Sequence, residues 1–495
     1  MNCVAKDGDS PIRGWSSRQW EARRSRVGRL FQGTCAFALV LGAGAGALAQ
    51  PAARALPEPS RDPLRVDPAS DPILQLGASR ASFDQFRDVI AAAVRRHPAT
   101  REQAATTDEA RAVLDEARER RLPSVDATVT SYRVISREFS NDPENIIERS
   151  RPDQRTDAQL SVQQTLFDFG ANNSRVRAAG ARLRAAALDA EATSDRVALS
   201  AIAAWYDMFA YRALTALTES FAESQRELRA SVEERVRQGV SAPGDVARVE
   251  SYIASAETRL ARFRRQLANA EARFEEIAGA APPAAVERAP APAAQVATRD
   301  DAALASAQSP AVQSAERLAE AARQEARAAR ADRLPQVAAG IDAGRYGVFE
   351  NDRDYDIRGR VSIRQRLFGG VDARADQLGA RARAVEARAD RVREEAARDA
   401  SIAWSDVQAL EEQLRALEAS YIAARRSRDV IVERFRVARG SLFDVVAAED
   451  TYFSAAAAYI EAIAELDAAR YVLLARTGRL LDVLAIDDAA GEERR

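Results

Sequence analysis

The sequence has little of what catalytic and metal sites are made from. Its 495 residues include one histidine, His97, and two cysteines, Cys3 and Cys35. A single histidine excludes a multi-histidine metal site and a histidine-based catalytic triad within one chain. No Walker-type phosphate loop and no G-x-S-x-G turn occurs in the sequence either. The sequence therefore predicts a protein that is not an enzyme and has no cofactor, and His97, beside Pro98, is interpreted as a helix-start residue.

An excess of charge of one sign is also missing. The chain has 72 basic and 74 acidic residues, so its formal net charge is −2. This balance gives no electrostatic reason to bind nucleic acid or to coat an anionic membrane surface. Aromatic residues make up 6% of the chain and charged residues 29%. Long stretches of Ala, Arg, Glu, Leu and Asp favour extended amphipathic helices over a compact aromatic core.

Residues 1–49 have the pattern of a secretory signal peptide. Several arginines between residues 13 and 29 precede an apolar run from Cys35 to Leu48, and the run ends in an Ala-Leu-Ala sequence. A positive flank, a short apolar run and an A-x-A cleavage pattern are typical of such leaders. The run is shorter than the roughly 20 residues of a spanning helix. Cleavage would remove both cysteines and leave an exported chain that begins at Gln50.

The mature chain repeats itself. The Leu-Pro pair at Pro123 recurs at Pro335, and the Gln-x-Leu-Phe sequence that ends at Phe167 recurs at Phe368. Further matching pairs follow in the same order, which predicts an internal duplication. The predicted organisation is a flexible Pro/Ala-rich N-terminal segment (50–80), a first repeat (81–278), a Pro/Ala-rich linker (279–300), a second repeat (301–484) and a C-terminal tail (485–495).

Each repeat has the same predicted order of elements. A helix of about 23 residues stops at the Leu-Pro pair, because the residue before proline leaves helical space. Two extended segments, a long helix without proline and a shorter returning helix follow. At about 1.5 Å per residue, each long helix would reach roughly 100 Å. The expected ranges are 98–121, 124–139, 155–167, 171–238 and 245–278 in the first repeat, and 310–333, 336–349, 355–367, 371–439 and 445–484 in the second.

The last predicted strand has one apolar and one strongly polar side. Between Asp356 and Leu367, apolar side chains alternate with arginine and serine. Such alternation fits a surface hairpin on a soluble core, and it also fits a membrane strand with its apolar side toward lipid and its polar side toward a wet lumen. The strands alone leave both alternatives open. In the membrane alternative, Phe167 and Phe368 are expected among the interfacial aromatics.

The long helices favour the membrane alternative. A coiled coil would explain the helices but would leave the leader and the strand pairs without a purpose. Four strands cannot close around a lumen, and open strand edges are not tolerated in lipid, so several chains must complete the wall. The predicted fold class is an internally duplicated α+β membrane protein, with four strands contributed to an oligomeric outer-membrane β-barrel and a long periplasmic coiled-coil tunnel of helices. The alternative is a pore-less periplasmic coiled-coil scaffold.

This repeated order resembles the TolC-like outer-membrane factor family. The similarity runs from about Ser82 to Leu484 and includes the turns between descending and returning helices at 235–246 and 434–445. The resemblance implies a homotrimer with one twelve-stranded barrel in outer-membrane lipid and a helical tunnel across the periplasm. It also implies a passive exit duct that works with a periplasmic adaptor and an inner-membrane pump of the ABC or RND type. No bond would be made or broken during export.

The resemblance indicates where the periplasmic mouth of the tunnel lies. Members of the family carry acidic residues beside the second inter-helix turn, and Asp444 falls on the first of these positions. Ala447 stands at the second, so a single acidic ring is supported and a double ring stays open. The spacing Ser441-x-x-Asp444 also has the form of a capping box. A local structural role for Asp444 is therefore an equal alternative.

The two turns are expected to reverse the chain and to meet the adaptor. Gly239 and Gly440 are expected to permit the reversals, and Asp245 is expected to be structural or adaptor-facing. Ser441 belongs to the same turn region. The stretch from Ser441 to Phe453 looks most like members coupled to type I protein secretion, but members that serve drug or metal efflux share much of it. The cargo is left open, with protein secretion slightly favoured.

Overall fold

The structure is a computed structural model that describes residues 56–60, 62, 65–139, 146, 150–292, 296–350, 354–437 and 439–486. The fold described below is that of the unit Arg54–Arg495. The expected signal peptide (1–49), the first hairpin loop at 141–145 and most of the C-terminal tail lie outside the described residues.

Each half of the chain contains the predicted order of helix, two strands, long helix and returning helix. In the first half these are α3 (Pro98–Glu119), β1 (Ser124–Arg133), β2 (Gln154–Phe167), α5 (Ala171–Arg237) and α6 (Pro243–Ala278). In the second half they are α8 (Pro310–Ala331), β3 (Gln336–Arg345), β4 (Tyr355–Arg364), α9 (Val371–Arg436) and α10 (Leu442–Arg476). The internal duplication is confirmed, and the shorter elements are α1 (Pro72–Gln75), α2 (Phe83–Arg96), α7 (Arg299–Ala305), η1 (Ser306–Gln308) and α11 (Leu480–Leu484).

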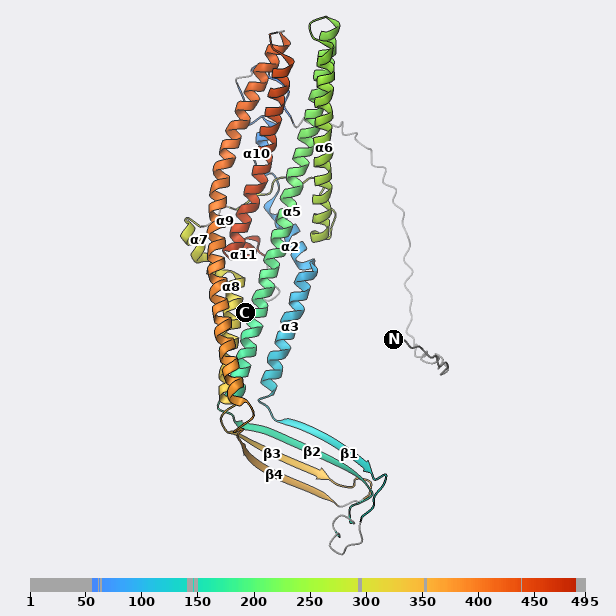
Figure 1. Cartoon of the computed structure of the whole chain (residues 1–495), viewed down its shortest axis with the longest axis vertical. Coiled ribbons are helices and arrows are strands. Elements are labelled where there is room, and N and C mark those ends of the chain that lie inside the picture. The colour runs from blue at the N-terminus through green and yellow to red at the C-terminus, as the bar shows by residue number, and fades with distance from the viewer. Residues whose placement is uncertain are drawn as a thin grey trace, which may run out of the picture. The chain divides into compact units, whose positions relative to one another are not determined.

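The helices of both halves lie side by side, with the sheet at one end (Figure 1). At the opposite end the chain turns from α5 into α6 and from α9 into α10. The long helices α5 and α9 contain 67 and 66 residues, close to the predicted lengths. His97 is the N-cap of α3, where its Nδ1 accepts a hydrogen bond from the Ala99 N–H at 3.2 Å. This geometry confirms His97 as a helix-start residue.

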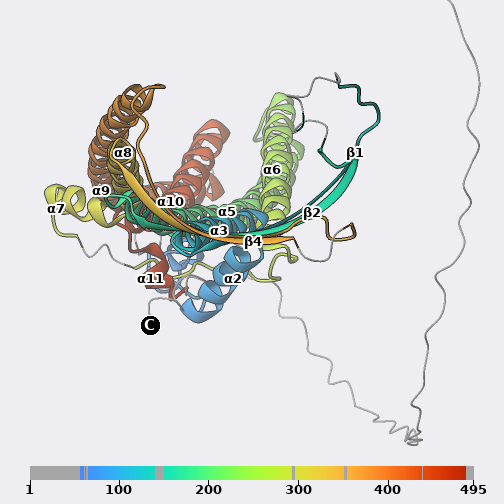
Figure 2. The same ribbon diagram turned by 90° about the horizontal axis from the view of Figure 1, so that it is seen from below.

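The four strands form one antiparallel sheet in the order β1-β2-β3-β4 (Figure 2 shows its curvature). The two halves meet at β2 and β3, where Val162 pairs with Ile341. Strands β1 and β3 end at Arg133 and Arg345, several residues before the predicted ends at 139 and 349. The predicted strands were too long because they included residues that have no partner in the β-ladder. Beyond the end of β3, the Tyr346 N–H still donates a hydrogen bond to the Asp354 carbonyl across the loop.

The sheet has one apolar face and one polar face, in register across all four strands. Val125 on β1 pairs with Val162, which pairs with Ile341 on β3, and the neighbouring row on β4 holds Val361. Val361 is 71% exposed and Ile341 53% exposed. The opposite face carries aspartates, serines, glutamines and arginines, including the Ser161–Asp342 hydrogen bond at 2.9 Å. A large apolar face without a cover inside the chain requires a partner or lipid.

The main core lies where α2, α5 and α10 meet. Phe86 of α2 is fully buried, and its ring lies 5.4 Å from Trp205, 6.2 Å from Tyr206 and 5.7 Å from Tyr471. Aromatic residues are few in the sequence, but they gather here and supply large contact areas. The core therefore joins the returning helix of the second half to the long helix of the first half.

The linker between the halves packs on this core. Tyr206 donates a hydrogen bond to the Ala289 carbonyl at 3.2 Å, and Tyr471 donates one to the Pro290 carbonyl at 2.9 Å. Arg288 forms an ion pair with Asp467, which is fully buried. Residues 279–292 are therefore a structured part of the core, and helix α7 begins at Arg299, inside the range expected for the linker.

The described part of the N-terminal segment, within the range 50–80 that was expected to be flexible, packs against the helices. Asp71 caps α1 by accepting hydrogen bonds from the Ile73 and Leu74 N–H groups at 2.8 and 3.1 Å. Leu56, Ile73 and Leu74 are buried in the main core. The Pro/Ala-rich composition concealed these few apolar anchors.

None of the helices in the described part of the chain combines the length and the apolar character that a membrane crossing requires.

Candidate functional site

The helix turns farthest from the sheet form the candidate site. Gly239 ends α5 with a φ of 73°, a left-handed conformation that glycine adopts without strain. Gly440 does not use this conformation, because its φ lies outside the left-handed region. A Cβ at this position would make a close van der Waals contact of 3.4 Å with the Phe435 nitrogen. The expected reversal at each glycine is present, and only the first depends on positive φ.

A small apolar cluster ties the two hairpins together near these turns. Val232 of α5, Val249 of α6 and Phe435 of α9 are buried in it with Val445 and its neighbours on α10. Arg235 lies across the cluster, because its guanidinium carbon is 4.3 Å from the centre of the Phe435 ring and its Nη1 donates to the Phe435 carbonyl at 3.0 Å. Near the turns, these side chains hold the two hairpins together.

Asp444 caps the start of α10. Its backbone N–H donates to Ser441 Oγ at 3.2 Å, while its Oδ2 accepts from the Ser441 hydroxyl at 2.8 Å and from the Ser441 N–H at 3.4 Å. The predicted capping box is therefore formed. Asp444 stays exposed, so the cap does not remove its carboxylate from solvent. Both alternatives for this residue remain compatible with its geometry.

Asp245 holds the equivalent position on α6. Its Oδ2 accepts a hydrogen bond from the Ala242 N–H at 3.2 Å. Ala242 has no side-chain oxygen, so only half of the reciprocal cap exists in the first repeat. This contact supports a structural role for Asp245.

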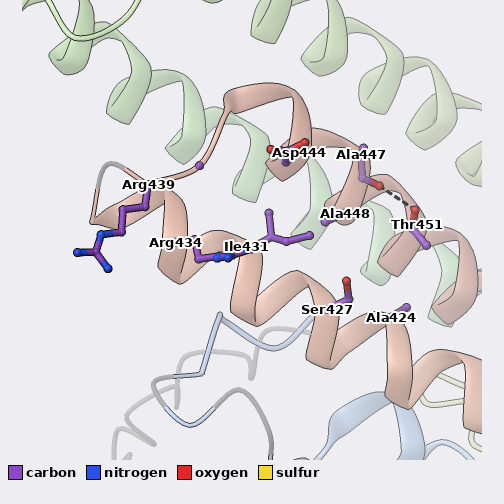
Figure 3. Close-up of a pocket in the computed structure, with 10 residues that line it drawn as sticks. Ala424, Ser427, Ile431, Arg434, Arg439, Asp444, Ala447, Ala448 and Thr451 are labelled. Atoms are coloured by element: carbon purple, nitrogen blue, oxygen red, sulfur yellow. Dashed lines mark hydrogen bonds between the residues drawn. The ribbon is translucent and has the colours of Figure 1, made fainter.

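A groove of about 510 Å³ lies between α9 and α10 beside the second turn (Figure 3). Its helical walls are mostly small side chains, and two arginines and Asp444 lie toward the turn. Ala447 lines the same groove as Asp444, so the position at which the resemblance implies a second acidic residue has an uncharged side chain. The lining residues are Ala424, Ser427, Ile431, Arg434, Arg439, Gly440, Asp444, Ala447, Ala448 and Thr451.

The two nearby acids do not replace the missing one. Glu449 is 3% exposed and pairs with Arg428 of α9 at 3.5 Å. Asp450 pairs with Arg259 of α6 at 2.8 Å. The groove therefore presents a single acidic position, Asp444.

A buried charged cluster behind the groove was missed from the sequence. Arg428 is 1% exposed, its Nε lies 2.7 Å from Asp429 Oδ1, and its guanidinium carbon lies 4.3 Å from the centre of the Tyr452 ring. Burial raises the pKa of Glu449 and of Asp429, while Arg428 acts in the opposite direction on both. The sequence indicated the burial of Glu449 only by its helical spacing, which places it on the same side of α10 as the apolar Val445, Val446 and Phe453.

Replacing Glu449 by glutamine is expected to flatten the pH dependence of stability. Because burial raises the pKa of Glu449 above the unfolded value of 4.5, the native state binds its proton more tightly than the unfolded state does. The free energy of unfolding then falls as the pH rises from about 4.5 through the raised pKa. Glutamine does not titrate, so the Glu449→Gln variant does not show this part of the decrease.

The measurement is the unfolding temperature between pH 4.5 and pH 8 for the wild type, Glu449→Gln and the control Asp450→Asn, whose side chain is half-exposed. The wild type and the control should lose stability with rising pH more steeply than Glu449→Gln. Equal slopes for all three would show that Glu449 does not titrate in this range.

The predicted interfacial aromatics lie where the sheet joins the helices. A bulge between Thr165 and Phe167 brings Phe167 opposite Val337, on the apolar face, where it is 54% exposed. Its ring centre is 4.6 Å from that of Phe169. Phe368 follows β4 and is 89% exposed. The position and exposure of both residues fit an interfacial role, which stays a prediction.

The two long hairpins, joined at one end to an amphipathic sheet with open edges, define a subunit of an outer-membrane channel. The chain belongs to the outer membrane efflux protein family, whose model matches residues 89–280 and 302–479, one match in each half. The resemblance to the TolC-like outer-membrane factors is confirmed. The protein is located in the outer membrane and extends into the periplasm. Membership of a channel family disagrees with the alternative of a pore-less scaffold.

Solved structures share the fold over most of the chain. The outer membrane protein VceC of Vibrio cholerae has a TM-score of 0.71 at 18% identity, covering 80% of this chain and 96% of its own. The CmeC outer membrane channel of Campylobacter jejuni has a TM-score of 0.69 at 15% identity, covering 82% and 91%. The open-state MtrE channel of Neisseria gonorrhoeae has a TM-score of 0.65 at 19% identity, covering 80% and 89%. A search of curated protein sequences gave no match.

Proposed function

We propose that three copies of this chain form a passive exit duct through the outer membrane. The supporting observation is the sheet. Among the described strands, β1 pairs only with β2 and β4 pairs only with β3, so each end of the sheet has an open edge. Open edges are costly in lipid, and closure with other copies removes them. Three copies of four strands would give the twelve-stranded barrel of the resembled family.

The dimensions of the sheet support its placement in lipid. Strand β3 contains 10 residues, and at about 3.4 Å per residue with a tilt near 40° it spans about 26 Å. An outer-membrane barrel has an apolar band about 25 Å tall. The apolar face would contact lipid, and the polar face, with Asp342 and Arg360, would line a wet lumen. Purified protein that forms a heat-modifiable trimer and conducts ions in planar bilayers supports this proposal, whereas a soluble monomer contradicts it.

The proposed aperture is a ring of Asp444 side chains, one from each copy. We expect Asp444→Asn to weaken block of the channel current by divalent cations by about tenfold, because it removes the charge and keeps an acceptor for Ser441. Asp444→Ala should weaken the block equally and also lower the unfolding temperature, because it removes the cap.

Single-channel recording in planar bilayers measures the block, and Asp245→Asn is the control from the first repeat. Unchanged block in Asp444→Asn would assign Asp444 to helix capping alone. An equal loss of block in Asp245→Asn would place the cation site on both turns.

The proposed partners are a periplasmic adaptor and an inner-membrane pump of the ABC or RND type. The groove between α9 and α10 supports adaptor contact at this end, because its small side chains allow a helix to approach closely. Gly440 and Ser441 lie at the turn beside this groove, and Gly239 and Asp245 lie at the turn of the first hairpin. Type I protein secretion is the proposed cargo route because of the stretch from Ser441 to Phe453, and small-molecule efflux is the alternative. Co-purification of the native complex identifies which pump is present.

A further inference from the structure

The N-terminal segment makes buried polar contacts with the α9–α10 hairpin. Its described residues, 56–60 and 65–77, are named here the N-terminal brace. Near one end of the brace, the Pro57 carbonyl accepts a hydrogen bond from Arg428 Nη2 at 3.0 Å. Near the other end, the Gly77 carbonyl accepts one from Arg288, which also holds Asp467 in the core. The brace therefore contacts α9 at Arg428 and, through Arg288, α10 at Asp467.

Asp71 is the central contact of the brace and is fully buried. Its carboxylate accepts hydrogen bonds from Tyr421 of α9 at 2.8 and 3.0 Å and forms an ion pair with Arg425. The Tyr421 hydroxyl lies 3.2 Å from the Tyr452 hydroxyl of α10. One buried carboxylate thus joins the brace to α9 and, through Tyr421, to α10. Breaking such a contact leaves buried charge without compensation.

The position of these contacts along α9 matters for movement. Arg428 precedes the last residue of α9, Arg436, by eight residues, or about 12 Å of helix. Tyr421 and the brace residues Leu56 and Leu74 are buried in the main core, which is shared with the first half of the chain. Arg428 lies between Tyr421 and the turn, so it must move relative to that core if the turn end of α9–α10 swings away. The brace opposes this movement because Leu56 is held in the core while the neighbouring Pro57 carbonyl accepts the hydrogen bond from Arg428.

We infer that the N-terminal brace is a conformational device that holds the α9–α10 hairpin in the position seen in this structure and opposes its outward swing, with Asp71 as its main attachment. The inference rests on the proposed function, in which the helix turns splay to widen the periplasmic mouth. Opening requires the attachment at Asp71 to break or the brace to move with the hairpin. Channel opening is thus coupled to a segment outside both repeats.

The test compares the resting conductance of full-length mature protein in planar bilayers. Asp71→Asn should raise the resting conductance on the order of tenfold, because it weakens the charged contacts with Tyr421 and Arg425. Tyr421→Phe keeps the ring and removes the hydroxyl, so it should produce a smaller rise in the same direction. Asp67→Asn is the matched control, because Asp67 lies on the same segment, is exposed, and its carboxylate accepts a local hydrogen bond from the Ala69 N–H at 3.1 Å.

The outcomes separate the two proposals. Wild-type protein that conducts no ions contradicts the duct itself. Wild-type protein that conducts, together with Asp71→Asn and Tyr421→Phe variants that keep the wild-type resting conductance, overturns the brace and leaves the duct intact. If Asp71→Asn does not form the heat-modifiable oligomer, the Tyr421→Phe variant alone tests the brace. A raised resting conductance of this variant supports the brace, and an unchanged resting conductance contradicts it.

Discussion

Val361→Arg is expected to prevent stable assembly in the outer membrane. Val361 lies on the apolar face of β4, is 71% exposed within the chain and pairs with Ala339 in the middle rows of the sheet. An arginine on the lipid side of a barrel costs about 2–4 kcal/mol near the midplane. Each assembled channel would carry this cost once per copy, so the amount of heat-modifiable oligomer in outer-membrane fractions should fall severely.

The adjacent residue provides the control. Ser362 points to the polar face and pairs with Ala338, so Ser362→Arg places the same charge on the lumen side. This variant should assemble like the wild type and change only the conductance. An equal loss of heat-modifiable oligomer in both variants would show that the two faces of the strand do not differ in their contact with lipid. This result would contradict the proposed orientation of the sheet.

Asp467→Ala is expected to have the largest effect on stability outside the sheet. Asp467 is fully buried, and its two carboxylate oxygens lie 2.6 and 2.8 Å from Arg288 of the linker. Removing one partner of a buried ion pair costs about 3–5 kcal/mol, because the other charge is left without compensation. The unfolding temperature of the detergent-solubilised protein should fall strongly, and proteases should cut the linker sooner.

Glu465→Ala is the matched control for this change. Glu465 lies on the same helix, α10, but is exposed to solvent within the chain. Its replacement should leave the unfolding temperature and the protection of the linker nearly unchanged. If the two variants behave alike, the ion pair does not hold the linker to the core.

The regular elements were predictable from the sequence because their signals are local. Proline at the start of α8 and the Leu-Pro pair before β3 marked the ends of that helix within about two residues. The alternation on β4 gave the correct sides for Ile357 and Arg358. These features depend on neighbours only a few residues apart. The duplication predicted two strands in each half, but the pairing of β2 with β3 that joins the halves was not predicted.

The contacts that hold distant segments together were not predictable. Asp71 and Tyr421 are 350 residues apart, and no local pattern relates a carboxylate in a Pro-rich segment to a tyrosine on a long helix. Arg428 appears in the sequence as one of many helical arginines, yet it is 1% exposed. At Asp444 the capping box followed from spacing alone, whereas a role at an aperture depends on other copies of the chain.

The polarity of the strands has a consequence for copy number. Because every pairing from β1 through β2 and β3 to β4 is antiparallel, β1 and β4 run in opposite directions. In the proposed oligomer, the joint between β4 of one copy and β1 of the next would therefore be antiparallel, like every joint within the chain. Backbone hydrogen bonding would accept two, three or four copies equally well. In the proposed oligomer, the angle at which helices of neighbouring copies pack would then set the ring size, and we expect substitutions on the outer flanks of α3 and α9 to alter the number of copies.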